Sequence, residues 1–239
     1  LAMLHSVKGL EHAEIMRPAY AIEYDCIDPT ALYPTLEYKH ISGLYGAGQF
    51  NGSSGYEEAA VQGFVAGVNA ARKIKGEPPF ILGREQAYIG TLIDDLVTKG
   101  TNEPYRIMTS RSEYRLILRQ DNADERLAPI GHELGLVSDE ALQKVNDKYD
   151  AVRREIKRLE HTGVPSSDAL NALLSERGTA EVHDGSPLIA LLRRPQLTYD
   201  DLRDFDAGCH AFPPALAESV EIACQSLGRA PTVEEIQDF

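Results

Sequence analysis

The spacing of hydrophobic and polar residues changes several times along the chain. Up to about Gly48, short apolar runs alternate with turn residues: AYAIEYD, the breaks at Pro29 and Pro34, and HISGLYGAG. This pattern predicts short strands joined by turns. From Gly55 until Gly76 the apolar residues recur at helical spacing, at Val61, Phe64, Val65, Val68 and Ala71. The N-terminal part is therefore predicted to contain strands, a glycine-rich turn and one long helix.

The middle of the chain is predicted to be helical. Apolar residues within 89–97 repeat at helical spacing and stop before Gly100, which suits the left-handed residue that follows a helix end. The residues SRSE at Ser110–Glu113 fit a capping box. They predict a second helix, which runs to about Arg119.

A longer helix is predicted to begin at Ser138 and to stop before Gly163. Its apolar residues step by three and four positions, as in a heptad repeat: Leu142, Val145, Tyr149, Val152, Ile156 and Leu159. Fewer than four heptads are present, so packing within the chain's own helical domain is favoured over an intermolecular coiled coil. Shorter helices are expected around residues 168–176, 187–193 and 199–205.

Charge adds a local feature to this picture. The 239 residues include 24 Lys and Arg against 37 Asp and Glu, a formal net charge of −13, and 43% are hydrophobic, enough to bury a core. Between Pro104 and Arg119 the balance reverses, with four arginines against one glutamate. A phosphate group responds to such a patch within a Debye length. The overall acidity therefore does not exclude a nucleic-acid partner.

Several other classes of site and protein are disfavoured. Cys26, Cys209 and Cys224 are odd in number and far apart, so neither a disulfide framework nor a metal site is predicted. The seven histidines are scattered. No apolar run approaches the length of a membrane span, and the first residues lack the features of a secretory signal. These features predict a cytoplasmic protein without a membrane partner.

The glycine-rich stretch GLYGAGQFNGSSGYEEAA runs directly into the first long helix. Glycines before a helix let a ligand approach the backbone, and the first helical N–H groups then face it with partial positive charge. Phosphates and electron-rich rings fit such a place. The amides of Gln49 and Asn51 can donate and accept hydrogen bonds toward a polyhydroxyl or heterocyclic ligand. A turn that binds no ligand is the alternative interpretation.

The stretch 43–72, with RPAYAIEYD before it and the segment from AYIGTLIDDL to NADERL after it, resembles the MnmG/GidA family. These are the FAD-binding subunits of bacterial enzymes that modify the wobble uridine of tRNA. The resemblance runs from about Met3 to about Leu202. After Ile222 the sequence departs from the aromatic-rich, basic continuation expected of the family. Docking of a partner by residues 206–239 is therefore not predicted.

The resemblance implies an incomplete α/β flavin-binding segment, glutathione-reductase-like, followed by a mainly α-helical domain. Residues 1–80 would be the C-terminal part of the FAD-binding domain, 81–164 a helical arm with a tRNA-binding helix, and 165–239 an incomplete C-terminal helical domain. The helix that begins near Gly55 would aim its N-terminal donors at the flavin edge that gains negative charge on reduction. The FAD-contacting residues would be Gly46, Gly48, Gln49, Asn51, Gly52, Gly55 and Tyr56.

The resemblance also implies a reaction and its partners. The family enzyme works with the GTPase MnmE and uses FAD, NADH and methylenetetrahydrofolate to add a carboxymethylaminomethyl-type group to the wobble uridine. A homodimer is implied for the full-length protein. The catalytic cysteines of the family lie upstream of Leu1, so no catalytic residue is assigned in this segment and Cys26 is only a secondary candidate. Two other functions remain open: a generic FAD/NAD oxidoreductase acting on a small molecule, and a helical interaction module.

The arginines of TSRSEYRLILR recur at every fourth position, so on a helix they would project along one side. We predict that this edge grips the tRNA backbone, with Tyr105 and Tyr114 as stacking faces for unpaired bases. The predicted tRNA-binding residues are Arg106, Arg111, Arg115 and Arg119. The alternative is a solvated salt-bridge network between the arginines and nearby acids, namely Glu113, Asp121, Asp124 and Glu125.

Overall fold

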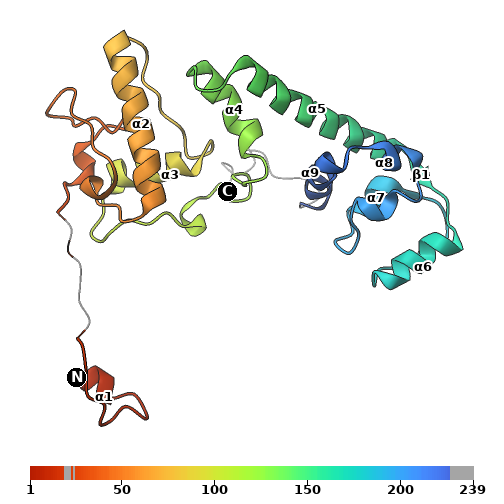
Figure 1. The fold of residues 1–239 in the computed structure, drawn as a ribbon, viewed down its shortest axis with the longest axis horizontal. Helices are drawn as coiled ribbons and strands as arrows, with labels where there is room; N and C mark the ends of the chain where they lie inside the picture. Colours follow the sequence, from red (N-terminus) through yellow and green to blue (C-terminus); the bar gives the residue numbers. More distant parts are fainter. Residues whose placement is uncertain (19–22, 24, 227–239) are drawn as a thin grey trace. The chain divides into compact units, whose positions relative to one another are not determined.

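The computed structural model describes residues 1–18, 23 and 25–226. The chain divides into two compact units: Leu1–Phe80 with Asp95–Arg106, and Ile81–Asp94 with Ile107–Phe239. Figure 1 traces the elements of both units along the chain. Among the described residues, no helix is both long enough and apolar enough to cross a membrane.

The first unit contains one long helix and several short helical turns. These are α1 (Ala2–His5), 3-10 turns at Pro29–Ala31 and Gly48–Asn51, α2 (Tyr56–Lys75) and a π-helix at Asp95–Lys99. The chain after the π-helix reverses at Gly100, whose φ of +67° is the left-handed conformation predicted for it.

Extended strands predicted before Gly48 are absent from the described residues 25–48, so that prediction is wrong there; most of AYAIEYD lies outside the described residues. Only isolated bridges pair this region, Leu32 with Tyr38 and Glu37 with Tyr45. The backbone groups are used in turns instead. Pro29 begins a 3-10 turn, and the side chain of Asp28 accepts a hydrogen bond from the N–H of Thr30.

The predicted helix after the glycine-rich turn is confirmed as α2. Gly76 ends it with a φ of +72°, and the N–H of Glu77 donates to the carbonyl of Arg72. Its buried face differs from the predicted apolar one, because Phe64 is 46% exposed and Ala71 is also exposed. The buried face is largely polar instead, and consists of Glu58, Gln62, Val65, Ala66 and Asn69.

The second unit is mostly helical. Its helices are α3 (Tyr88–Asp94), α4 (Ala123–Glu133), α5 (Asp139–His161), α6 (Asp168–Glu176), α7 (Leu188–Leu192), α8 (Ala207–Ala211) and α9 (Pro214–Gln225), with 3-10 turns at Thr109–Arg111 and Asp200–Leu202. Two short strands, β1 (Gly163–Val164) and β2 (Ser186–Pro187), pair in antiparallel register. The shorter helices expected near 168–176 and 187–193 are confirmed, whereas the segment near 199–205 forms only a single 3-10 turn.

The long helix α5 is the centre of this unit. The hydroxyl of Ser138 accepts a hydrogen bond from the N–H of Ala141 and caps the helix as predicted. The predicted apolar stripe is at least partly buried along its length, and α5 packs against α4, α7 and α9. This confirms packing within the chain's own helical domain. The core contains residues of all the helices from α5 to α9, among them Val152, Leu159, Leu170, Leu174, Leu188, Leu191, Leu192, Cys209 and Val220.

The helix predicted from Ser110 to Arg119 does not form. A 3-10 turn at Thr109–Arg111 is followed by a non-helical turn, in which the N–H of Leu118 donates to the carbonyl of Tyr114. The hydroxyl of Ser112 accepts from the N–H of Tyr114, a local bond that competes with helix formation. Tyr114 is 7% exposed and Leu118 4% exposed. These two buried side chains anchor the turn, and its arginines do not share one helical edge.

A buried polar network lies inside the helical unit. The Tyr199 hydroxyl donates to Oε1 of Glu155 at 2.6 Å, and the guanidinium of Arg158 donates to both oxygens of the same carboxylate at 2.8 and 2.9 Å. Arg158 also pairs with Asp206 at 2.8 Å. Tyr199 is fully buried, and burial raises the pKa of its hydroxyl. The buried Glu155 carboxylate needs all of these partners, because a charge taken out of water is costly unless it is paired.

We expect Tyr199→Phe to lower the free energy of unfolding by about 1–3 kcal/mol, because it leaves a buried carboxylate oxygen without one of its donors. Urea denaturation followed by circular dichroism measures the change. Tyr56→Phe is the matched control, since the Tyr56 side chain is 93% exposed. Equal stabilities of the two variants would contradict the importance of the network.

Candidate functional site

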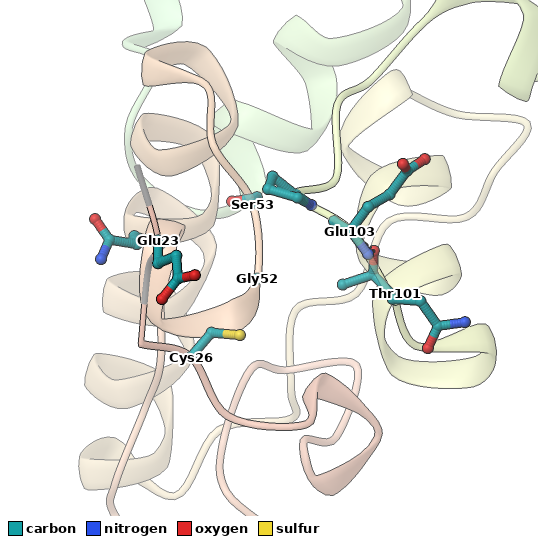
Figure 2. A pocket seen from close by; sticks show the side chains of 9 residues that line it. Glu23, Cys26, Gly52, Ser53, Thr101 and Glu103 are labelled. Atoms are coloured by element: carbon teal, nitrogen blue, oxygen red, sulfur yellow. Dashed lines mark hydrogen bonds between the residues drawn. The ribbon is translucent and has the colours of Figure 1, made fainter. Parts of the chain in front are cut away.

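A cleft of about 450 Å³ opens beside the glycine-rich turn in the first unit. Figure 2 shows Glu23 and Cys26 on one side of it, Thr101 and Glu103 on the other, and Gly52 between them. Its volume falls within the range of small-molecule sites. The lining residues are Glu23, Cys26, Gln49, Gly52, Ser53, Thr101, Asn102, Glu103 and Pro104.

The two walls of the cleft are joined by backbone hydrogen bonds. The N–H of Tyr105 donates to the carbonyl of Gly52 at 2.8 Å, and the N–H of Ser54 donates to the carbonyl of Tyr105 at 3.2 Å. The Tyr105 hydroxyl donates to the carboxylate of Asp95 at 2.8 Å, which ties the second wall to the π-helix. The cleft is therefore a fixed feature of the first unit.

Two glycines in the turn are required by geometry. Gly48 and Gly52 have φ values of +68° and +79°, which side chains rarely adopt. A Cβ at Gly48 would lie 2.9 Å from the Cβ of Ala59, and one at Gly52 would lie 2.9 Å from Cγ2 of Thr101. A side chain at Gly52 would also narrow the cleft that it lines.

The buried amide of Gln62 holds this turn in place. Its Oε1 accepts hydrogen bonds from the N–H of Gly48 at 3.1 Å and from Nδ2 of Asn51 at 2.8 Å. Its Nε2 donates to the hydroxyl of Ser53 at 2.8 Å, and that hydroxyl donates to the carbonyl of Gly48. Gln62 was not predicted from the sequence, where the available signal was a glutamine one turn after Glu58 in the helix that follows the glycine-rich turn.

The two predicted amide ligands have different environments. Gln49 is exposed and lines the cleft. Asn51 is fully buried, and a Cβ on Gly46 would lie 2.3 Å from its Oδ1. That oxygen accepts no hydrogen bond from the described residues. Asn51 therefore supports the turn, whereas Gln49 is available to a ligand.

The start of α2 is covered by the helix's own acid. A Cβ on Gly55 would lie 1.6 Å from Oε2 of Glu58 and 2.6 Å from Nη1 of Arg106. Glu58 is 3% exposed, and its carboxylate lies 3.9 Å from the Arg106 guanidinium. A carboxylate therefore lies at the N-terminal end of α2, where the helix carries a partial positive charge. Tyr56, in contrast, projects into solvent.

The four predicted RNA-binding arginines lie in different settings. Arg106, in the first unit, has a 58% exposed side chain. In the second unit Arg111 is half-buried, and Arg115 is exposed and makes no ion pair with the described residues. Arg119 donates from Nε and Nη2 to the two carboxylate oxygens of Asp121, each at 3.0 Å. This ion pair holds the pKa of Asp121 below its usual range.

Of the ion pairs in the predicted salt-bridge alternative, the described part of the chain contains Arg119 with Asp121. The other acids pair with different cations: Glu113 with Arg84, Asp124 with Lys148 and Glu125 with Arg153. The predicted stacking role of two tyrosines is wrong, because Tyr105 is 3% exposed and Tyr114 is 7% exposed. Neither ring offers a face to a base.

The described residues hold no group of three or more His, Cys, Asp or Glu positioned to bind a metal ion. Cys26 is a free thiol exposed beside the cleft, and Cys209 and Cys224 are free and buried. Burial raises the pKa of each buried thiol to about 11, so both are protonated at neutral pH.

Comparison with known proteins identifies both units. Residues 1–78 match a family model described as glucose inhibited division protein A, and residues 139–225 match one described as the tRNA modifying enzyme MnmG/GidA C-terminal helical domain. The structure of Aquifex aeolicus GidA in its form II crystal superposes with a TM-score of 0.72 at 45% identity, covering 94% of this chain and 35% of that one.

Two curated relatives extend the likeness. The tRNA uridine 5-carboxymethylaminomethyl modification enzyme MnmG of Caldicellulosiruptor saccharolyticus is 56% identical over 240 residues, which is all of this chain and 38% of that protein. The enzyme of the same name from Alkaliphilus metalliredigens is 60% identical over 205 residues, 86% of this chain and 32% of that protein. The likeness thus continues past Leu202.

The fold and the two family models define this chain as a segment of one class of protein, in which a glycine-rich unit accompanies a helical domain. The chain belongs to the MnmG/GidA family. It spans about a third of the length of the relatives it matches.

We expect Gln62→Leu to lower the free energy of unfolding by at least about 3 kcal/mol. The substitution leaves the partners of three buried hydrogen bonds unpaired, each at about 1–3 kcal/mol. Urea denaturation measures the loss, and hydrogen exchange at the Gly48 amide should speed up locally. The control is Gln143→Leu on the exposed side of α5, expected to change stability by less than about 0.5 kcal/mol. Similar losses in both variants would show that Gln62 does not support the turn.

Proposed function

We propose that the complete protein adds a carboxymethylaminomethyl-type group to the wobble uridine of tRNA, with FAD as its cofactor. The observation that carries this proposal is the 56% identity, over the whole chain, to a relative named for tRNA uridine modification. NADH, methylenetetrahydrofolate, the GTPase MnmE and a homodimer belong to the same proposal through the family. This chain would supply part of the cofactor cleft and part of the RNA-binding surface.

The cleft fits the uncharged part of FAD. The Gln49 amide can donate and accept hydrogen bonds, and the bare backbone at Gly52 leaves room that a Cβ would fill. Glu23 and Glu103 also line the cleft, and two carboxylates oppose a diphosphate. A carboxylate can accept a hydrogen bond from an N–H of a heterocycle. The ring of FAD, or the sugar-like chain attached to it, therefore suits this wall better than the diphosphate does.

A bound flavin would supply the redox chemistry. In this proposal Gln49 orients the cofactor by its amide, and Gly52 lets the backbone approach it. Gly46 and Gly48 support the site by allowing the turn to close over Asn51 and Ala59. The roles proposed for Gly55 and Tyr56 are contacts at the rim of the turn, since Glu58 covers the helix end itself.

The RNA surface is proposed to lie on the turn at 107–119. Arg115 is the most available cation there, because it is exposed and its guanidinium is not used by the described residues. Arginine offers a planar fork that suits phosphate. Arg111 contributes charge in the same turn, and Arg119 adds a guanidinium shared with Asp121. Arg106, an exposed cation of the first unit, is proposed to make its own contact with the RNA.

In the complete protein, we expect Gln49→Ala to weaken FAD binding about tenfold, the effect of losing one hydrogen bond worth about 1.4 kcal/mol. Flavin absorbance of the purified protein and a titration of the apoprotein measure it. Gln120→Ala is the control, since Gln120 is exposed in the other unit. An unchanged dissociation constant would remove Gln49 from the cofactor site.

We also expect replacement of Arg111, Arg115 and Arg119 by alanine to weaken tRNA binding by orders of magnitude without changing the FAD content. The plot of log affinity against log salt should flatten by roughly 0.7–0.9 for each phosphate that the protein no longer neutralises. Most of the effect should come from Arg115→Ala alone. Arg154→Ala, an exposed arginine of α5, serves as control. Affinity and salt slope at wild-type values would place the RNA path elsewhere.

A further inference from the structure

Arg84 lies at the centre of a set of contacts on the RNA-binding turn proposed above. Its Nε and Nη2 donate to the two carboxylate oxygens of Glu113 at 2.7 and 2.9 Å. Nη2 also donates to the carbonyl of Arg111 at 3.1 Å, and Nη1 donates to Asp94 at 3.0 Å. A bidentate guanidinium–carboxylate pair fixes both distance and orientation. Arg84 therefore joins the segment before α3 to the start of the turn.

A second arginine holds the other end of the same turn. Nη2 of Arg126 donates to the carbonyl of Arg119 at 3.2 Å, and its Nε donates to Oδ1 of Asn122 at 2.9 Å. The Asn122 amide donates to the carbonyl of Ile117 at 3.0 Å. The turn has few backbone hydrogen bonds of its own, and these side chains add to them.

Glu113 is the one acid within the basic segment Pro104–Arg119. It lies two positions from both Arg111 and Arg115, and its side chain is 45% exposed. An unpaired carboxylate at this point would offset one of the neighbouring positive charges and repel phosphate within a Debye length. The Arg84 side chain is only 21% exposed, so its charge faces the carboxylates of Glu113 and Asp94 more than it faces solvent.

We propose that Arg84 is a positioning residue for RNA binding: it neutralises Glu113 beside Arg115, so that the charge of Arg115 remains available to phosphate. This inference rests on the proposed function. Arg84 acts through Glu113 and does not itself touch the RNA. The defect caused by losing Arg84 is therefore expected to depend on whether Glu113 is present.

A double-mutant cycle in the complete protein tests the dependence. The probe is an unmodified tRNA transcript, and the readout is its dissociation constant at a fixed, low salt concentration. We expect Arg84→Gln to weaken binding about tenfold. The double variant Arg84→Gln with Glu113→Gln should return to within about threefold of wild type. Glu113→Gln alone should bind at least as tightly as wild type, and this arm remains informative if Arg84→Gln does not fold.

Arg177→Gln is the matched control, because it removes the same charge from an arginine of the helical domain whose side chain is 45% exposed and pairs with Asp201. It should leave the dissociation constant unchanged. A double variant as weak as Arg84→Gln would overturn the inference, since a direct phosphate contact or a general folding defect is not rescued by removing Glu113. Weaker binding by Glu113→Gln alone, or no effect of Arg84→Gln, would overturn it too.

Arg115→Ala, measured in parallel, separates this inference from the proposed function. If wild type binds the transcript and Arg115→Ala does not, the proposed RNA surface is correct. The double-mutant cycle then tests only the role of Arg84. If Arg115→Ala binds like wild type, the proposed RNA surface fails whatever the cycle shows. Flavin absorbance of every variant reports that the cofactor unit is intact.

Discussion

A polar group taken out of water needs a partner, and in the first unit this requirement falls mainly on the amide of Gln62. A turn with two left-handed glycines exposes backbone donors and acceptors at one place, and among the described residues no strand lies there to pair with them. Gln62 satisfies the N–H of Gly48, the Asn51 amide and the Ser53 hydroxyl together. The position of the exposed Gln49 follows from this arrangement, because it lies between residues whose positions the Gln62 amide fixes.

In other parts of the chain, different side chains satisfy the buried polar groups. Asn69 pairs with both the N–H and the carbonyl of Phe80 and so fixes the chain that returns from α2. In the helical unit, Arg158 and Tyr199 together satisfy the buried Glu155. Around these polar contacts, the buried leucines of α5, α6 and α7 stabilise the helical unit by the hydrophobic effect, which has no preferred direction. Each unit thus contains buried polar contacts that specify its geometry, and in the second unit they accompany an apolar core.

The sequence pattern correctly predicted the elements that depend on apolar packing or on contacts between residues close in sequence. The apolar stripe of α5, the Ser138 cap and Gly76 each act within a few residues, so their pattern is visible in the sequence. The buried face of α2 was misjudged because Gln62 and Asn69 are buried for their hydrogen bonds, and periodicity counts only apolar residues. The glutathione-reductase-like architecture remains a prediction. The family was recognisable because its motifs are long.

The basic turn shows why a correct motif gave a wrong helix. A capping box requires the glutamate to reach back to the N–H three residues earlier. Here the carboxylate of Glu113 is bound on both oxygens by Arg84, a residue 29 positions away, and no local pattern contains that competition. Arg84 thus occupies the carboxylate that a capping box would need, and the same contact neutralises the one acid of this segment in an otherwise acidic chain. Arg115 is exposed on a turn that the hydrogen bonds of Arg84 and Arg126 stabilise.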